Sequence, residues 1–422
     1  MKKILFFNIM VAVILLPMFA QADFSGSADI TLIGNIPEAD GYGSLLNPGN
    51  MLGIEDIAMM PSLIAKLDAG DEKTSFSAWF SMKEYPIGQG LLTAAYGDPA
   101  QTGGVYELVS ATGDKIYYFD LMRLSTNIYL TDNISMEIGR QSMLTGYGYG
   151  WNPIDFANPL KNPTDPDAEL RGVDAFVLRS YLGNSASLKI YALAPQDLLA
   201  AGLDYEEIKP GGELTLNFPG MELKLSGLWD YDNTEGTDAY TPSAGAAFML
   251  DFFGIGIYSE AAARKGSRTF SPDGSTRKTD WMFSGLAGME YTFESELYAV
   301  IEYFYNGEGF DKTERADFQT SLSFPTFNLL STYTPGYFSQ HYILVNLMQP
   351  LYDFDTDLNL SAIYSPDSGA LTIMQSINYS FSGNFSINMT YTGMFDFSNN
   401  DFNEITALPV RHVVSTVFTY SY

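Results

Sequence analysis

"FSINMTYT", residues Phe385–Thr392, alternates apolar and polar residues without a break. Phe385, Ile387, Met389 and Tyr391 are apolar, and the residues between them are polar. A period of two is that of a β-strand with one apolar and one polar face. The same alternation recurs in three other segments, residues 188–192, 213–218 and 280–293. The chain is therefore predicted to consist largely of one-sided strands.

The connections between these strands alternate in length. Eight short turns are expected near residues 70–72, 131–133, 183–185, 219–220, 253–254, 294–296, 353–357 and 382–384. Nine longer connections are expected near residues 35–58, 84–115, 142–171, 196–210, 232–240, 265–279, 307–335, 365–369 and 396–408. A soluble β-sandwich also has one-sided strands, but nothing in it requires this alternation of lengths. Outer-membrane barrels have short periplasmic turns and longer outer loops.

The fold predicted is thus all-β: a transmembrane antiparallel up-and-down barrel of about 18 strands. The region 307–335 could hide an extra hairpin and the connection at 365–369 is short, so the range is 16–18 strands. A barrel of this size leaves an aqueous channel unless something narrows it.

The N-terminus predicts export. Lys2 and Lys3 precede an apolar segment, Ile4–Phe19, and Ala20-Gln21-Ala22 resembles a cleavage site. We expect residues 1–22 to be a cleaved signal peptide and residues 23–422 to form a single barrel domain in the bacterial outer membrane. The alternating end "STVFTYSY" places Phe418, Tyr420 and Tyr422 on one face, as in the C-terminal signal that the barrel-assembly machinery recognises.

Composition argues against several functions. The net charge of −28 makes a nucleic-acid partner improbable. The chain has no cysteine, which excludes thiol chemistry, and only two histidines, His341 and His412. An outer-membrane hydrolase would need one of them as its base, but His412 shares the parity of lipid-facing residues and His341 has no recognisable triad. We expect neither an enzyme nor a cofactor nor a metal.

The polar parity of the strands predicts which side chains face the lumen, although a merely solvated interior explains each of them equally well. They are Glu137, Gln141, Lys189, Glu213, Lys224, Asp230, Glu290 and Glu302. The acidic balance of the chain predicts that the pore prefers cations.

One outer connection of about 30 residues, 142–171, follows "RQ" with "SMLTGYGYGWNPIDFANPLKNPTDPD". A loop of this length is uncommon unless it is functional or disordered, and its aromatics and prolines argue against disorder. We expect it to fold into the barrel, with Tyr147, Tyr149 and Trp151 packed on the wall or lining a constriction. The alternative is a surface lid. A calcium site built from Asp155, Asp165, Asp167 and Glu169 is conceivable, but the spacing is not that of an EF-hand.

Three motifs, "IGRQ" at Ile138–Gln141, "YGWNPIDFANP" at Tyr149–Pro159 and "RGVDAF" at Arg171–Phe176, resemble the outer-membrane porins related to the alginate-export family. The resemblance implies a passive channel with a solute preference. It also implies that Arg140, Trp151, Asp155, Arg171 and Asp174 shape the loop and the pore. Strand parity instead places Arg140 on the lipid side unless Gly139 forms a bulge. The few basic residues do not fit a channel for a polyanion.

The function predicted is passive diffusion of small hydrophilic solutes, with lipid, solutes and the assembly machinery as partners and the oligomeric state open. Two alternatives remain: a surface adhesin and a hydrophobic-compound transporter of the fatty-acid type. The second is suggested by "LLNPGN" at Leu45–Asn50, which resembles the Asn-Pro of an N-terminal hatch.

Overall fold

The computed structural model describes residues 21–37, 41, 44, 47–90, 107–194, 207–232, 239–322, 336–398, 401–406 and 408–422. Residues 1–20, most of the expected signal peptide, lie outside the described residues. The first strand already begins at Gln21, two residues before the expected mature N-terminus.

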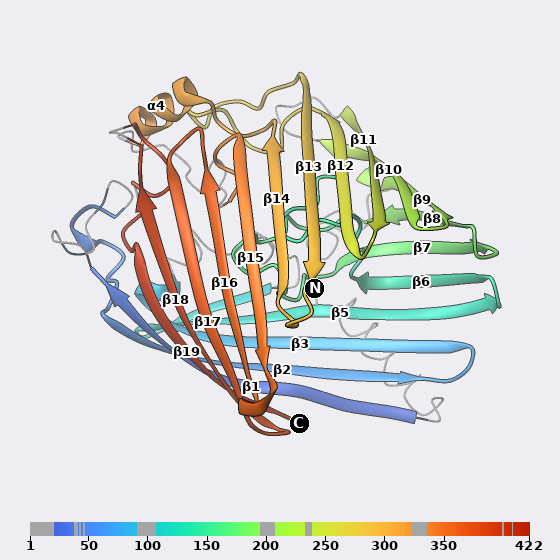
Figure 1. The fold of residues 1–422 in the computed structure, drawn as a ribbon, viewed down its shortest axis with the longest axis horizontal. Coiled ribbons are helices and arrows are strands. Elements are labelled where there is room, and N and C mark those ends of the chain that lie inside the picture. Colours follow the sequence, from blue (N-terminus) through green and yellow to red (C-terminus); the bar gives the residue numbers. More distant parts are fainter. Residues whose placement is uncertain are drawn as a thin grey trace.

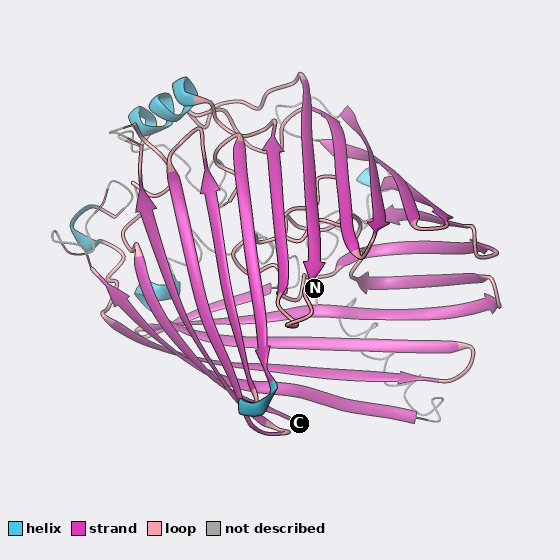
Figure 2. Ribbon diagram, viewed as in Figure 1, coloured by secondary structure: helices cyan, strands magenta, loops and turns pink. Residues whose placement is uncertain are grey.

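Strands dominate the structure (Figure 2). They are β1 (Gln21–Ile36), β2 (Ile57–Gly70), β3 (Thr74–Pro86), β4 (Glu107–Thr112), β5 (Lys115–Thr131), β6 (Ile134–Gln141), β7 (Val173–Leu182), β8 (Ala186–Leu193), β9 (Lys209–Phe218), β10 (Met221–Asp232), β11 (Ala239–Phe252), β12 (Ile255–Lys265), β13 (Trp281–Thr292), β14 (Tyr298–Asn306), β15 (His341–Leu351), β16 (Thr356–Ser365), β17 (Ala370–Ser382), β18 (Phe385–Asp396) and β19 (His412–Ser421). The helices whose bounds are described are α4 (Lys312–Ser321) and two 3-10 turns, η2 (Pro48–Asn50) and η5 (Tyr352–Phe354), and residues 87–90 are helical as well.

The sheet closes on itself because β1 pairs antiparallel with both β2 and β19 (Figure 1). Within the described part of the chain the ring has 18 antiparallel strands, which confirms the predicted fold and the upper end of the predicted range. The remaining strand, β4, pairs with residues 115–120 of β5, beyond the end of β6, and does not belong to the ring. Every predicted short turn and long connection falls between the corresponding pair of strands.

Two of the long connections contain structure that the sequence did not predict. The connection 84–115 contains β4, which forms a hairpin with the start of β5. In the connection 307–335, the described part contains the helix α4 and not an extra hairpin. Asp311 caps this helix by accepting hydrogen bonds from the amides of Thr313 and Glu314, which satisfies donors that the first turn leaves without partners.

The outer face of the barrel is apolar. Large side chains such as Ile190, Phe283, Ile301, Ile377 and Met389 alternate with inward polar residues and remain 45–60% exposed. Beside the short turns, aromatic side chains gather in pairs: Tyr291 with Phe293, Tyr379 with Phe381, and Phe385 with Tyr420. An apolar band with an aromatic girdle is the surface that a barrel presents to lipid. Among the described residues, no helix is both long and apolar enough to cross a membrane.

Candidate functional site

The connection between β6 and β7 enters the barrel and packs on its inner wall. Figure 1 shows it within the outline of the strands, behind β13 and β14. Trp151 and Ile154 are 0% and 1% exposed, and the loop contacts side chains from β9 to β15. Trp151 is therefore covered by the wall, and Tyr147 and Tyr149 pack against the same cluster while staying partly exposed.

Glu260, in the middle of β12, holds the first part of this loop. Its carboxylate accepts hydrogen bonds from the amides of Tyr147 at 2.5 Å, Gly148 at 3.0 Å and Ile154 at 3.4 Å. The side chain is 2% exposed. Hydrogen bonds from backbone amides to a carboxylate are charge-assisted and stronger than those to a neutral acceptor. These bonds offset the cost of burying the charge.

Glu302 of β14 holds the next two residues of the loop. Its carboxylate accepts from the amide of Tyr149 and from that of Gly150, the latter at 2.8 Å, and also from the hydroxyl of Tyr258 at 2.7 Å. Two carboxylates on the wall thus take up four consecutive amides, residues 147–150. The sequence "GYGYG" thus presents its backbone to Glu260 and Glu302.

The glycines explain why this approach is possible. Gly146 has a φ of +108°, and a Cβ there would lie 2.6 Å from the Glu260 Oε1. A Cβ on Gly150 would lie 2.8 Å from the Leu344 Cδ1 and 3.2 Å from the Glu302 Oε2. Glycine adopts positive φ without steric cost and lets the backbone come close to another group. Gly146 lies against Glu260 and Gly150 against Glu302, so a glycine stands where the backbone meets each carboxylate.

Trp151 anchors the turn that follows. Its ring stacks on Phe304 with centroids 5.1 Å apart and lies 5.6 Å from the ring of Tyr342. Its Nε1 donates to the Gly336 carbonyl at 3.1 Å, so that the buried indole has a partner for its polar atom. Tyr147 has a different environment: its hydroxyl donates to Glu222 at 2.6 Å, and the Lys224 ammonium lies 4.3 Å from its ring centroid.

Asp155 organises the loop from within. It accepts from the side-chain amide of Asn158 at 2.7 Å and from the backbone amides of Ala157, Asn158 and Thr145. Burial raises the pKa of Asp155, and the bonds from Asn158 oppose that rise. Asp155 is thus a bracing residue of the loop and is only 8% exposed.

The distal part of the loop is tied down as well. The Lys161 ammonium donates to the Gly148 carbonyl at 3.2 Å, and the Tyr337 hydroxyl donates to the Lys161 carbonyl at 2.8 Å. Burial lowers the pKa of Lys161. Glu169 forms ion pairs with Lys66 at 3.3 Å and Arg123 at 2.9 Å, on the opposite wall. The loop therefore spans the lumen from β14 to β2.

The remaining residues that the resemblance implied lie where the loop joins the wall. Arg171 pairs with Asp120 at 2.7 Å. Arg140, 5% exposed, pairs with Asp174 at 3.4 Å. The register pairs Ile138 with Phe176 and Arg140 with Asp174, and it is continuous through Gly139, so there is no bulge at that residue. Gly139 instead has a φ of +115°. The Arg140–Asp174 pair thus joins the end of β6 to the start of β7.

The other side chains predicted to face the lumen lie on the inner wall, most of them in ion pairs. Glu137 pairs with Arg179 at 2.8 Å and Lys189 with Glu213 at 3.1 Å. The other contacts are Lys224 with Glu222 at 3.4 Å, Asp230 with Lys209 at 2.7 Å and Arg264 at 2.5 Å, Glu290 with the Tyr298 hydroxyl at 2.5 Å, and Gln141 with the Ala175 carbonyl at 3.3 Å.

Sequence reasoning missed Glu260, which accepts hydrogen bonds from three backbone amides of the loop, more than any other wall carboxylate described. The signal was present, because Glu260 shares the parity of Tyr258 and Ala262 in a strand that is otherwise neutral until Arg264. A carboxylate in the middle of a predicted strand and on its inward face was therefore detectable. Its partner could not be found from spacing alone, because Tyr147 lies 113 residues away.

The residues considered for calcium do not come together. Asp155 is buried within the loop, whereas Glu169 contacts Lys66 and Arg123. Among the described residues there is no group of three potential metal ligands. Both histidines lie on the outward side and bond to tyrosine hydroxyls, His341 to Tyr303 at 2.7 Å and His412 to Tyr391 at 3.0 Å. In the segment Leu45–Asn50, residues 45 and 46 lie outside the described residues. Asn47 lies in the connection after β1, whereas a hatch would precede the first strand.

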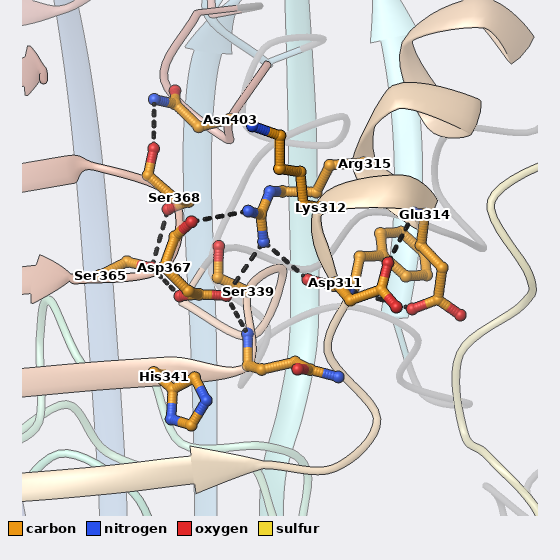
Figure 3. Close-up of polar contacts among 12 residues, drawn as sticks. Asp311, Lys312, Glu314, Arg315, Ser339, His341, Ser365, Asp367, Ser368 and Asn403 are labelled. Atoms are coloured by element: carbon orange, nitrogen blue, oxygen red, sulfur yellow. Dashed lines mark hydrogen bonds and ion pairs between the residues drawn. The ribbon is translucent and has the colours of Figure 1, made fainter. Parts of the chain in front are cut away.

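Above the barrel, three outer loops are joined through α4 (Figure 3). Arg315, 2% exposed, donates to the carboxylate of Asp367 at 3.0 Å, to its carbonyl at 2.7 Å and to the Phe310 carbonyl at 2.8 Å. Asn403 donates to the Ser368 carbonyl at 3.1 Å. Under the helix, four aromatic residues form one cluster: Phe310, Phe318, Phe338 and Phe402. We call this assembly of 307–322, 336–340, 366–369 and 401–408 the outer cap; residue 407 lies outside the described residues.

No protein-family model and no curated protein matches this chain. The solved structures that match it include bacterial porins. A substituted porin of Rhodopseudomonas blastica shares 11% identity, with 95% of this chain and 100% of that chain covered and a TM-score of 0.45. OmpF of Salmonella typhi, in complex with daunomycin, shares 10% identity, with 95% and 97% covered and a TM-score of 0.45.

Proposed function

We propose that this chain forms a bacterial outer-membrane channel for passive diffusion of small hydrophilic solutes, and that the loop 142–171 sets its conductance. The observation that supports this most directly is the attachment of that loop to Glu260 and Glu302 inside a barrel with a polar inner wall. A barrel of this width has room for an aqueous channel, and a loop fastened across the lumen narrows it. The local resemblance to the alginate-export-related porins covers this same segment.

The proposal includes export and assembly. Residues 1–22 would be removed as a signal peptide, leaving 23–422 as one barrel domain. The outward side chains Phe418 and Tyr420 are 42% and 40% exposed near the end of β19, in a position where the barrel-assembly machinery could bind them together with Tyr422. The proposed function requires no bond-making chemistry, no metal and no cofactor.

The channel is further proposed to prefer cations. Most inward bases are neutralised by acids, as in Arg179–Glu137 and Lys189–Glu213. Several inward acids have no such partner: among the described residues, no ion pair involves Asp29, Asp68, Glu260, Glu290 or Glu302. These carboxylates are the basis for the proposed negative field of the wall. Such a field concentrates cations, and salt weakens it as the Debye length falls from ~10 Å at 0.1 M to ~3 Å at 1 M.

Reconstitution in planar bilayers tests both the channel function and the cation preference. We expect discrete conductance steps and, in a salt gradient, a reversal potential of the sign that indicates cation selectivity at low salt. Absence of any channel current from a folded, heat-modifiable barrel would contradict the channel, and anion selectivity would contradict only the cation preference. Deleting Leu144–Pro166 should raise single-channel conductance. An unchanged conductance in a folded deletion variant would show that the loop does not limit flow.

A further inference from the structure

The inner face of β15–β19 differs from the rest of the wall because, between the strand ends, it carries no charge. The register places its inward side chains in rows across the strands. One row contains Asn359, Ser376, Thr390 and Ser415, and the next row toward the short turns contains Asp357, Asn378, Asn388 and Val417. Ion pairs between strands, and most inward carboxylates, occur instead on β1–β14. One side of the lumen thus offers mainly amides and hydroxyls, with apolar side chains such as Met374 and Val417 among them.

Several of these groups have hydrogen-bonding capacity that the protein does not use. Asn346, 0% exposed, pairs in register with Ser361, 6% exposed. Neither the amide nitrogen nor the amide oxygen of Asn346 makes a hydrogen bond with a described residue, nor does the Ser361 hydroxyl or the Asn359 Oδ1. Buried polar atoms normally have partners, because leaving them without one costs free energy. These atoms are covered in this structure, so a solute in the lumen must bind the more exposed polar side chains of the same face.

The loop packs on the outer part of this face, where Trp151 lies against Tyr342 of β15 and clusters with Leu344 and Ile363. Its hydrogen bonds and ion pairs to the wall described above end on β2, β5, β9, β10, β12 and β14. Toward the short turns, Ser376, Asn378, Asn388 and Thr390 are partly exposed. These four side chains are therefore open to a solute that has passed the loop.

We infer that the inner face of β15–β19 is a binding track for uncharged polyhydroxyl solutes, such as small sugars, which bind it through hydrogen bonds to Asn and Ser/Thr side chains. This inference rests on the proposed channel function and names its solute class. A hydroxyl both donates and accepts, as the wall does. An ether oxygen only accepts, and an ion would lose hydration without meeting an opposite charge.

The test is the block of ion current by sucrose in planar bilayers, with polyethylene glycol of similar mass as the ether probe. We expect sucrose to reduce the current saturably and the polyether to reduce it without saturation. Thr390→Val removes an inward hydroxyl that donates to the Asn388 Oδ1 at 2.8 Å. It should raise the half-blocking sucrose concentration by roughly two- to ten-fold, the effect of one hydrogen bond. Thr416→Val is the matched control, because Thr416 pairs with the outward residues Met389 and Leu32.

The outcomes separate the two proposals. If the wild-type barrel carries no current, the channel function itself fails. If it carries current but sucrose does not block it saturably, or if Thr390→Val and Thr416→Val change the block equally, the track fails while the channel stands. Heat-modifiable gel mobility of both variants confirms that each is folded before the currents are compared.

Discussion

Glu260 on β12 and Glu302 on β14 accept hydrogen bonds from adjacent pairs of backbone amides in one loop, Tyr147–Gly148 and Tyr149–Gly150. The two carboxylates fix the loop through its main chain. The position of the loop therefore depends on the charge of the wall and on the absence of Cβ atoms. It depends less on the identity of the tyrosines between the glycines.

Replacing both carboxylates by amides should loosen the loop. In Glu260→Gln/Glu302→Gln, each side chain keeps one acceptor oxygen and loses its charge. Each charge-assisted bond contributes about 1.5–3 kcal/mol, so the double variant should show higher and noisier single-channel conductance. Glu290→Gln is the control, because Glu290 bonds to Tyr298 of its own hairpin. A double variant that conducts like the control would show that the two glutamates do not hold the loop in its narrowing position.

A methyl group at Gly146 should also raise single-channel conductance, because it would clash with the Glu260 carboxylate. Gly146→Ala places a Cβ 2.6 Å from the Glu260 carboxylate, in a backbone conformation with φ +108°. Gly183→Ala is matched to it, since Gly183 also has a positive φ, +66°, but has no atom within 4 Å of the added Cβ. Both lose about 1 kcal/mol or more to backbone strain. Only Gly146→Ala should raise conductance. Equal conductance in the two variants would contradict the steric explanation.

Arg315 should be the residue on which the outer cap depends most. Arg315→Ala removes a buried guanidinium with three acceptors, and breaking a buried pair typically costs about 3–5 kcal/mol. We expect faster hydrogen exchange in residues 366–369 and 401–406. Lys312→Ala also removes an ion pair, with Asp401, but the lysine side chain is 73% exposed, so the cost should stay within about 1 kcal/mol. Similar exchange in the two variants would argue against a cap held by Arg315.

The cap should also respond to pH through Glu404. Burial raises the pKa of Glu404 to about 7, and the hydrogen bond from the Tyr342 hydroxyl opposes this rise. The folded cap then holds this proton more tightly than the unfolded chain does. Its stabilising contribution is complete below the ordinary value of 4.5 and is lost as pH rises toward 7. Hydrogen exchange of residues 401–406 should accelerate over that range in the wild type. The acceleration should be absent in Glu404→Gln, and its persistence there would assign it to another group.

The strand pattern was predictable because it is local. Alternation along a segment such as Phe385–Thr392 depends on neighbours two residues apart, and each connection length can be read from the chain itself. The helix α4 was not predicted, since it lies in a polar connection where only the capping pair Asp311 and Glu314 marked it. The attachment of the loop depends on residues more than 100 positions apart, such as Tyr147 and Glu260. The alternation of residues along a strand does not indicate which distant residues will meet.

The distance along the chain between the loop and its anchors has a consequence for biogenesis. Glu260 follows Tyr147 by 113 residues and Glu302 follows Gly150 by 152. Contacts at such separations close long segments of chain and form late in folding. The loop can dock only when β12 and β14 are in the sheet together with β6 and β7. The wall of the barrel must therefore be largely assembled before the loop narrows its lumen.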